Sequence, residues 1–162
     1  MGNRYDRFKA LDEMALGEEF HSPGRTVTEA DCVLFTGLAG LKAPLFVDAE
    51  YSRKHGKYGR RVVPGLLTAA LTAGMMEDIL GPFTLAALEL STLKFTHPLF
   101  HGDTIHCVIT VTGKADTSKP DIGVLTIRAQ QFNQDDQQVF ELTGKFLMLK
   151  DRASLTERTP AT

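Results

Sequence analysis

The sequence has no strong excess of either charge. Its 162 residues include 18 Lys and Arg against 20 Asp and Glu, which gives a formal net charge of -2. A nearly balanced chain lacks the overall field that would hold nucleic acid or an anionic membrane surface. We therefore expect neither as a partner, and any anionic group of a ligand must be met by a local basic cluster.

Cysteine is also scarce. Cys32 and Cys107 stand far apart in the sequence, and neither has a second cysteine nearby. This spacing fits neither a zinc site nor a redox motif, so we predict no metal. Both residues lie in apolar stretches, where a thiol behaves as a small buried hydrophobe and suits a reducing cytosol.

Long hydrophobic runs are missing as well. The longest apolar stretch, 62–76, is interrupted by Pro64, Gly65 and Gly74 and is shorter than the ~20 residues that a membrane span needs. Residues 1–20 carry scattered charges and no apolar segment typical of a signal peptide. Together these absences predict a cytoplasmic protein.

Composition and length predict one globular domain. Hydrophobic residues make up 43% and charged residues 23% of the chain, as in ordinary soluble domains. The length is about that of one domain, and the sequence holds no internal repeat, low-complexity segment or linker. We place the domain at residues 1–153 and assign 154–162 to a polar, frayed C-terminal tail.

Two helices are predicted early in the chain. Thr28 precedes two acidic residues and an apolar repeat at helical spacing, which indicates a capped helix of about three turns. Asp48 is a second capping residue, and a short polar helix should run from there toward His55. The segment 40–46 between the two helices is predicted to be a loop.

A third helix and then a series of strands are predicted to follow. Pro64 and Gly65 open the helix, and its body, 66–76, is apolar nearly all round, so it must be enclosed on most sides. Thereafter come β-type runs, with a polar turn at 133–137. The runs are 85–95, 104–113, 123–132 and 139–150. We therefore predict an α+β domain in which one long antiparallel sheet wraps around a buried central helix.

Three blocks of sequence carry a resemblance to a known family. They are 26–31 (TVTEAD), 44–51 (PLFVDAEY) with 61–67 (RVVPGLL), and 93–104 (LKFTHPLFHGDT). In order and spacing, these blocks make the chain similar to the MaoC-like dehydratases, relatives of the (R)-specific enoyl-CoA hydratases, over about residues 20–150. The resemblance implies a hotdog fold, a role in fatty acid metabolism, and assembly into a homodimer or a higher even oligomer.

The family's catalytic pair is absent from this chain. In hydratases of the family, an Asp after the first helix and a His about five residues later act on one water as general base and acid. Alignment on Pro44 places Leu41 at the Asp and Phe46 at the His, with Ala43 where an Asn is usual. None of these side chains can transfer a proton. We therefore predict no catalytic residues at these positions and a changed function.

The family's binding apparatus is retained at the start of the third helix. Gly65 resembles the position whose backbone N–H polarises the thioester carbonyl. A second interpretation, compatible with the first, is that Gly65 begins a tightly packed helix where no Cβ fits. We predict that Pro64 and Leu66, with Leu41 and Phe46, add apolar surface to the same binding site.

A basic cluster follows the second helix. Its members are Lys54, His55, Lys57, Arg60 and Arg61. Lysine and arginine form charge-assisted hydrogen bonds with phosphates, so the cluster suits the phosphates of coenzyme A. Arg61 is the best candidate, because it lies next to the apolar segment that follows. The alternative is a solvated helix face.

Other candidate acid–base residues have structural interpretations. His97 and His101 flank Pro98 and would share one side of a strand only if the strand stayed regular there. We expect surface or structural roles for both histidines. Asp48 and Asp103 are interpreted as caps of backbone donors.

Three functions remain open. A protein that binds an acyl thioester without efficient catalysis fits the residues best, with coenzyme A as part of the ligand and no separate cofactor. An enoyl-CoA hydratase or dehydratase, a lyase, is what the resemblance implies, but it requires a non-standard acid and base. An acyl-CoA thioesterase requires a polar group beside the helix N-terminus, and 66–76 supplies only Thr68 and Thr72.

Overall fold

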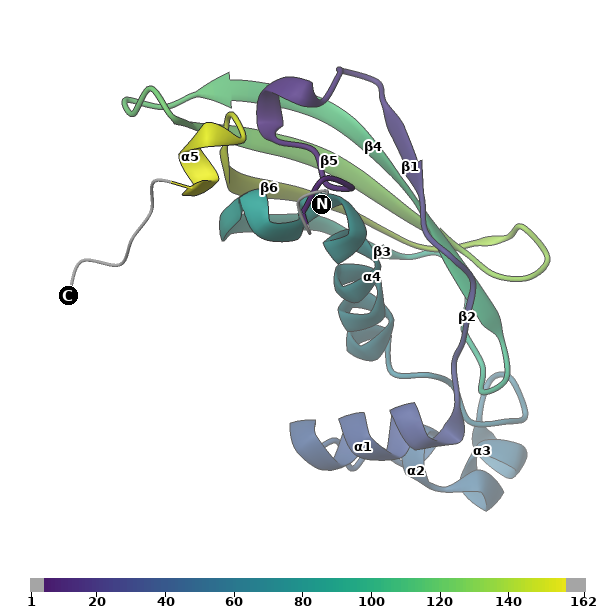
Figure 1. The fold of residues 1–162 in the computed structure, drawn as a ribbon. Coiled ribbons are helices and arrows are strands. Elements are labelled where there is room, and N and C mark those ends of the chain that lie inside the picture. The colour runs from purple at the N-terminus through teal and green to yellow at the C-terminus, as the bar shows by residue number, and fades with distance from the viewer. Residues whose placement is uncertain (1–4, 157–162) are drawn as a thin grey trace.

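The computed structural model describes residues 5–156 and has one curved antiparallel sheet over a central helix (Figure 1). The strands are β1 (Glu19–His21), β2 (Arg25–Thr26), β3 (Thr84–Phe95), β4 (Thr104–Asp116), β5 (Ile122–Phe132) and β6 (Gln138–Leu149). The helices are α1 (Glu29–Ala39), α2 (Pro44–Val47), α3 (Ala49–His55), α4 (Gly65–Leu80) and α5 (Ala153–Thr156), with 3-10 turns η1 (Leu11–Glu13) and η2 (Gly81–Phe83). The predicted α+β fold is confirmed, whereas β1 and β2, which precede the helices, are not predicted by the sequence.

The sheet has β3 at one edge. The strand order is β1-β4-β5-β6-β3, all neighbours are antiparallel, and β2 also pairs with β4. Three irregularities interrupt the pairing of β3 with β6. Leu88, Leu90 and Phe95 of β3 are each about half exposed. The edge strand is therefore both apolar and poorly covered within one chain.

The core lies between the sheet and one face of α4. The buried residues of that face are Leu67, Thr68, Leu71, Thr72, Met75, Met76, Ile79 and Leu80. Gln131 on β5 donates from Nε2 to Thr72 Oγ1 at 2.9 Å, and the Thr72 hydroxyl donates to the Thr68 carbonyl at 3.0 Å. These bonds pair the Gln131 amide nitrogen and the Thr72 hydroxyl, which would otherwise destabilise an apolar interior, while the buried Gln131 Oε1 has no hydrogen-bond partner among the described residues.

The opposite face of α4 is not covered. Leu66, Ala70, Gly74 and Glu77 are exposed, and they follow one another at helical spacing. Leu66 has 63% of its surface exposed. The prediction that this helix is enclosed on most sides therefore holds except along this exposed face, since most other residues of α4 are buried or partly buried.

The helices α1, α2 and α3 lie beyond the N-terminal end of α4, away from the sheet (Figure 1). The predicted caps are confirmed. Thr28 Oγ1 accepts from the Asp31 N–H at 3.2 Å, while the Asp31 carboxylate accepts from the Thr28 N–H at 2.8 Å. The Asp48 carboxylate accepts from the Tyr51 N–H at 2.8 Å.

The predicted loop 40–46 is wrong in its second half. Pro44–Val47 forms one helical turn, which the Asp48 N–H closes on the Pro44 carbonyl at 2.9 Å. A proline at the first helical position fixes φ near its helical value and lacks only an N–H that would be unpaired there. The proline therefore begins a helix rather than ending a loop.

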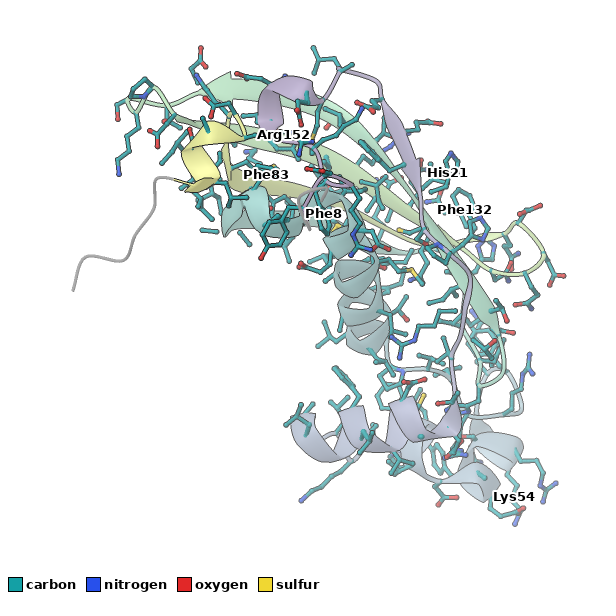
Figure 2. All side chains as sticks on the ribbon, viewed as in Figure 1. Phe8, His21, Lys54, Phe83, Phe132 and Arg152 are labelled. Carbon is teal, nitrogen blue, oxygen red and sulfur yellow. The ribbon has the colours of Figure 1, made fainter. Side chains whose placement is uncertain are left out.

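The predicted boundary at residue 154 falls within α5. The Asp151 carboxylate accepts from the Ser154 N–H at 2.8 Å, and Leu155 packs partly buried against the core. Arg152 donates to the Glu13 carboxylate at 2.7 Å and lies near Phe83 and Phe8 (Figure 2). The remaining residues of the predicted tail, 157–162, lie outside the described part of the chain. No helix within residues 5–156 is long and apolar enough to cross a membrane.

Candidate functional site

A cavity of about 310 Å³ opens at the N-terminus of α4. We call it the α4 cavity. It lies between α2, the chain that leads into α4, and the segment that follows β3. Its lining residues are Phe46, Tyr58, Val62, Val63, Gly65, Thr68, Phe95, Thr96, His97, Pro98, Leu99 and Val139. Most of these residues are apolar, and Tyr58, Thr68, Thr96 and His97 add polar groups, a combination found in small-molecule sites.

Gly65 lies where α4 meets the edge strand. A Cβ at this position would stand 2.9 Å from Cε1 of Phe95, so the ring packs there only because residue 65 is glycine. The N–H groups of Leu67 and Thr68 both donate to the Pro64 carbonyl, at 2.9 and 3.1 Å. At a helix N-terminus the preceding N–H groups have no partner within the helix. The Gly65 N–H, at the positive end of the helix dipole, can therefore bind an oxygen in the cavity.

The structure separates the other predicted apolar contacts. Phe46 lines the α4 cavity together with Gly65, and Pro64 is buried directly before the helix. Leu66 points away from the core and is not among the lining residues. Leu41 is half-buried outside the lining, where its N–H donates to a carbonyl of α1 at 2.9 Å. Of Leu41 and Phe46, the cavity lining includes only Phe46.

Arg61 lies at a second cavity. Its Nη2 donates to the Glu29 carboxylate at 2.8 Å, and this hydrogen bond holds the pKa of Glu29 below its ordinary value. The guanidinium of neighbouring Arg60 stacks over the Phe100 ring, 3.5 Å from its centroid. The second cavity is lined by Ala49, Glu50, Arg53, Gly59, Arg60, Arg61, Phe100 and His101.

The predicted basic cluster is divided among this cavity, solvent, and a further cavity of about 290 Å³ that His55, Lys57 and Arg60 help to line. Lys54 lies at the outer end of α3 and points away from α4 (Figure 2). Its Nζ is 3.4 Å from the carboxylate of Glu50, one turn earlier on the same exposed face. Lys54 therefore matches the alternative of a solvated helix face, whereas Arg60 and Arg61 retain contact with a cavity.

The two histidines at the bend face different surroundings. Strand β3 ends at Phe95, before the proline, so the regular alternation that would have put both on one side does not extend this far. His97 lines the α4 cavity, and its Nδ1 lies 2.8 Å from the Gln138 carbonyl. His101 lines the second cavity, with Nδ1 3.7 Å from the Glu29 carboxylate. The position of His97 in this lining was not predicted, because no local sequence pattern places it beside Gly65.

The remaining titratable groups singled out in the sequence have structural roles. The Asp103 carboxylate accepts from the Phe100 N–H at 2.8 Å, as predicted for a turn cap. Cys32 and Cys107 are buried free thiols, and burial raises their pKa values to about 11 and about 12. Within residues 5–156, no group of three or more His, Cys, Asp or Glu side chains could hold a metal ion.

A curved antiparallel sheet around a central helix, with a cavity at the N-terminus of that helix, defines a hotdog protein. A Mycobacterium tuberculosis protein described as a double hotdog fold superposes with a TM-score of 0.78 at 20% identity, over 94% of this chain and 46% of that one. The chain belongs to the MaoC-like domain family, whose model matches residues 12–131.

Relatives of this family include characterised hydratases. The chain is 30% identical to the (R)-specific enoyl-CoA hydratase of Rhodospirillum rubrum over 99 residues. This aligned region covers 60% of this chain and 67% of the hydratase. The crystal structure of a MaoC-like dehydratase from the same organism superposes with a TM-score of 0.77 at 25% identity, over 88% of this chain and 98% of that one. The resemblance stated from the three sequence blocks is thereby confirmed.

Proposed function

We propose that this protein binds an acyl thioester of coenzyme A in the α4 cavity and lacks efficient hydratase activity. The observation that carries the proposal is the place of Phe46, the residue aligned with the family's catalytic histidine, which lines the cavity together with Gly65. A phenyl ring adds apolar contact surface but can neither accept nor donate a proton. Leu41, at the other catalytic position, is equally inert.

Binding would use the end of α4 and the apolar lining. The thioester carbonyl oxygen accepts from the Gly65 N–H, and the helix dipole favours the partial negative charge on that oxygen. The acyl chain packs against Val62, Val63 and Val139. A volume of about 310 Å³ is at the small end of ligand pockets, which favours a short acyl group.

The coenzyme A phosphates would meet the basic residues of the neighbouring cavity. Arg60 and Arg61 line it, and guanidinium groups bind phosphate oxygens with paired hydrogen bonds. Phe100, in that lining, directly follows Leu99 of the α4 cavity, so one extended ligand can reach both. Arg60 is the principal phosphate contact in this arrangement, because the charge of Arg61 is already paired with Glu29.

The proposed assembly is a homodimer or a higher even oligomer of a cytoplasmic protein. An apolar edge strand left unpaired is a liability, and the half-exposed Leu88, Leu90 and Phe95 of β3 form such an edge. A second copy of the chain would cover it symmetrically. Sedimentation at micromolar concentration should give at least twice the chain mass of 17.8 kDa. A species of the chain mass alone would contradict the assembly.

Two measurements test the proposed function. Calorimetric titration should show that crotonyl-CoA binds more tightly than free coenzyme A, because the acyl group adds apolar contacts. Hydration of crotonyl-CoA should be at least about a thousandfold slower than in a hydratase with the Asp and His, within the range expected when general acid and base are lost together. Equal affinity for the two compounds, or turnover of about 10 per second as in a typical enzyme, would refute the proposal.

A matched pair of glycine variants tests the place of binding. In Gly65→Ala the new methyl would meet the Phe95 ring at 2.9 Å and crowd the helix end, so crotonyl-CoA should bind at least tenfold more weakly. Gly74→Ala is on the same helix with open space around the new methyl, and its affinity should match that of the wild type. Equal affinity of Gly65→Ala and Gly74→Ala for crotonyl-CoA would mean that the ligand binds outside the α4 cavity.

A further inference from the structure

We propose that His97 is the proton-transfer residue of the α4 cavity and that it supports a slow hydration of 2-enoyl thioesters bound there. This inference rests on the proposed function, because it requires the thioester to occupy the cavity. It assigns a role to a residue that lies outside the family's catalytic positions. The observations that carry it are the lining of the cavity, the hydrogen bond of the His97 ring, and the anchoring of its backbone.

The cavity lining offers few groups that can move a proton. Phe46 and its apolar neighbours have none. The Thr68 hydroxyl donates to the Pro64 carbonyl at 3.5 Å. Neither this alcohol nor the phenol of Tyr58 is a good base. Among the lining residues, His97 alone carries an imidazole, the side chain that enzymes use most often as a general acid and base.

The hydrogen bond of His97 fixes the form of its ring. Nδ1 lies 2.8 Å from the Gln138 carbonyl oxygen. A carbonyl oxygen can only accept, so Nδ1 must carry the hydrogen and donate it. In the neutral ring the lone pair is then on Nε2. A backbone carbonyl therefore holds the imidazole in the tautomer that a general base on the opposite nitrogen requires.

The backbone that carries His97 is anchored on both sides. The Thr96 N–H donates to the Val139 carbonyl at 3.0 Å, and the Thr96 hydroxyl donates to the same Gln138 carbonyl that His97 uses. Two residues after His97, the carbonyl of the buried Leu99 accepts from the Val63 N–H at 2.8 Å. The segment is thus tied to β6 on one side and to the approach to α4 on the other. Anchoring of this kind reduces the reorganisation that a catalytic group needs.

The proposed step adds one water across the double bond. As the water oxygen bonds to Cβ of the enoyl group, a water proton passes to Nε2 of His97, and the π electrons move toward the thioester carbonyl. The Gly65 N–H stabilises the resulting enolate oxygen. Nε2 then returns the proton to Cα. The product is a 3-hydroxyacyl thioester, the imidazole is again neutral, and no oxidant or reductant takes part.

The test compares two histidine-to-glutamine variants by loss of enoyl absorbance of crotonyl-CoA. His97→Gln replaces the ring with a polar amide that cannot transfer a proton. Its kcat/KM should fall at least about a hundredfold, as expected for the loss of a general acid–base group, while the Kd of crotonyl-CoA stays within about twofold of wild type. His106→Gln removes a histidine that stacks on Phe132 outside the α4 cavity, and it should retain wild-type turnover.

Chemical rescue distinguishes proton transfer from a structural role. In His97→Ala, added free imidazole should restore part of the lost turnover, because a small base can enter the space that the side chain vacates. Wild-type protein that binds crotonyl-CoA but does not hydrate it above the buffer rate would overturn this inference and leave the proposed function intact. Unchanged turnover in His97→Gln would likewise overturn the role of His97 and leave the proposed function intact. Failure to bind acyl-CoA at all would overturn both.

Discussion

The sheet with α4 and the group of helices at residues 29–55, here called the helical cap, are stabilised in different ways. In β6, residues such as Phe140 and Leu142 are almost fully buried. In the helical cap Leu34 is 72% exposed and Leu38 is 90% exposed. The sheet and α4 therefore form their own core, whereas the apolar residues of the helical cap are mostly uncovered within one chain.

Polar contacts attach the helical cap to the rest of the chain. Arg61 pairs with Glu29 at its start. The Leu45 carbonyl accepts from the Val62 N–H at 3.4 Å. Because Phe46 belongs to the helical cap and Gly65 to α4, the α4 cavity lies on the border between the two regions. Its shape depends on a boundary that is less tightly packed than the core.

The largest contrast between the regions is expected in stability. Phe140→Ala removes a fully buried ring that packs 5.0 Å from the ring of Phe95, and it should lower the free energy of unfolding by about 3–5 kcal/mol. Leu38→Ala removes an exposed side chain and should change it by less than about 0.5 kcal/mol. Urea unfolding measures both. Similar losses in the two variants would mean that a partner buries the helical cap as deeply as the core.

Substitutions in the helical cap, at its boundary with α4, should have an effect of intermediate size, measured as the rate of crotonyl-CoA hydration. The double variant Leu41→Asp with Phe46→His introduces the acid and base of the family's hydratases at the two positions that the resemblance aligns with them, so crotonyl-CoA hydration should rise about tenfold over wild type. The gain is limited, because Leu41 lies outside the cavity lining and a misplacement of about 1 Å can cost about a hundredfold.

The hydration assay on the double variant needs two controls. Phe46→His alone should show no comparable gain, because it supplies one member of the pair. A thermal melt checks folding, since an imidazole without a partner in place of the phenyl ring destabilises the site. A folded double variant that binds acyl-CoA but gains nothing would mean that the cavity itself has diverged from the hydratases.

The smallest predicted effect concerns pH and the start of the helical cap. Hydrogen bonds from the Thr28 backbone and hydroxyl, with Arg25 close by, hold the pKa of the Asp31 carboxyl below its ordinary value. The carboxylate therefore stabilises the folded state above its unfolded pKa of about 3.9, and this contribution is lost as the pH falls through the lower folded value.

Asp31→Asn tests this contribution. At pH 7 the variant should weaken the protection of α1 amides against hydrogen exchange by about 1 kcal/mol or less, in line with the loss of a helix cap. The difference from wild type should narrow as the pH falls below about 3.9, and it should close only below the lower folded pKa, where the wild-type carboxyl also becomes neutral. If the difference in amide protection between wild type and Asp31→Asn stayed constant from pH 7 down to pH 2, the charge of Asp31 would not be what stabilises the helix.

Local signals in the sequence predicted the helices well. Thr28, Asp48 and Pro64 mark helix starts through capping and fixed backbone angles, and all three helices begin there. The proline at residue 44 carries the same signal as Pro64, yet it was interpreted as part of a loop. A single turn is short enough that its apolar pattern does not repeat, so periodicity could not correct that interpretation.

The cavity was only partly predictable. Phe46 and Gly65 were found through the resemblance, because they occupy motif positions. His97 was not, because its place depends on the carbonyl of Gln138, 41 residues later in the chain. Arg61 was chosen for its closeness in sequence to the apolar segment, but its partner is Glu29, 32 residues earlier. Pairings over such separations arise from strand register and loop path, which a single sequence does not specify.

The buried hydrogen bond between Gln131 and Thr72 has a consequence for how this protein can change over evolution. Apolar contacts tolerate rotation of a helix about its axis, whereas a directional bond from the middle of the sheet permits one orientation. That bond ties the middle of α4 to the sheet, and neither Gln131 nor Thr72 lines the cavity. An exchange of a lining residue such as Phe46 therefore leaves this bond in place, so ligand preference can change while the attachment of α4 to the sheet is kept.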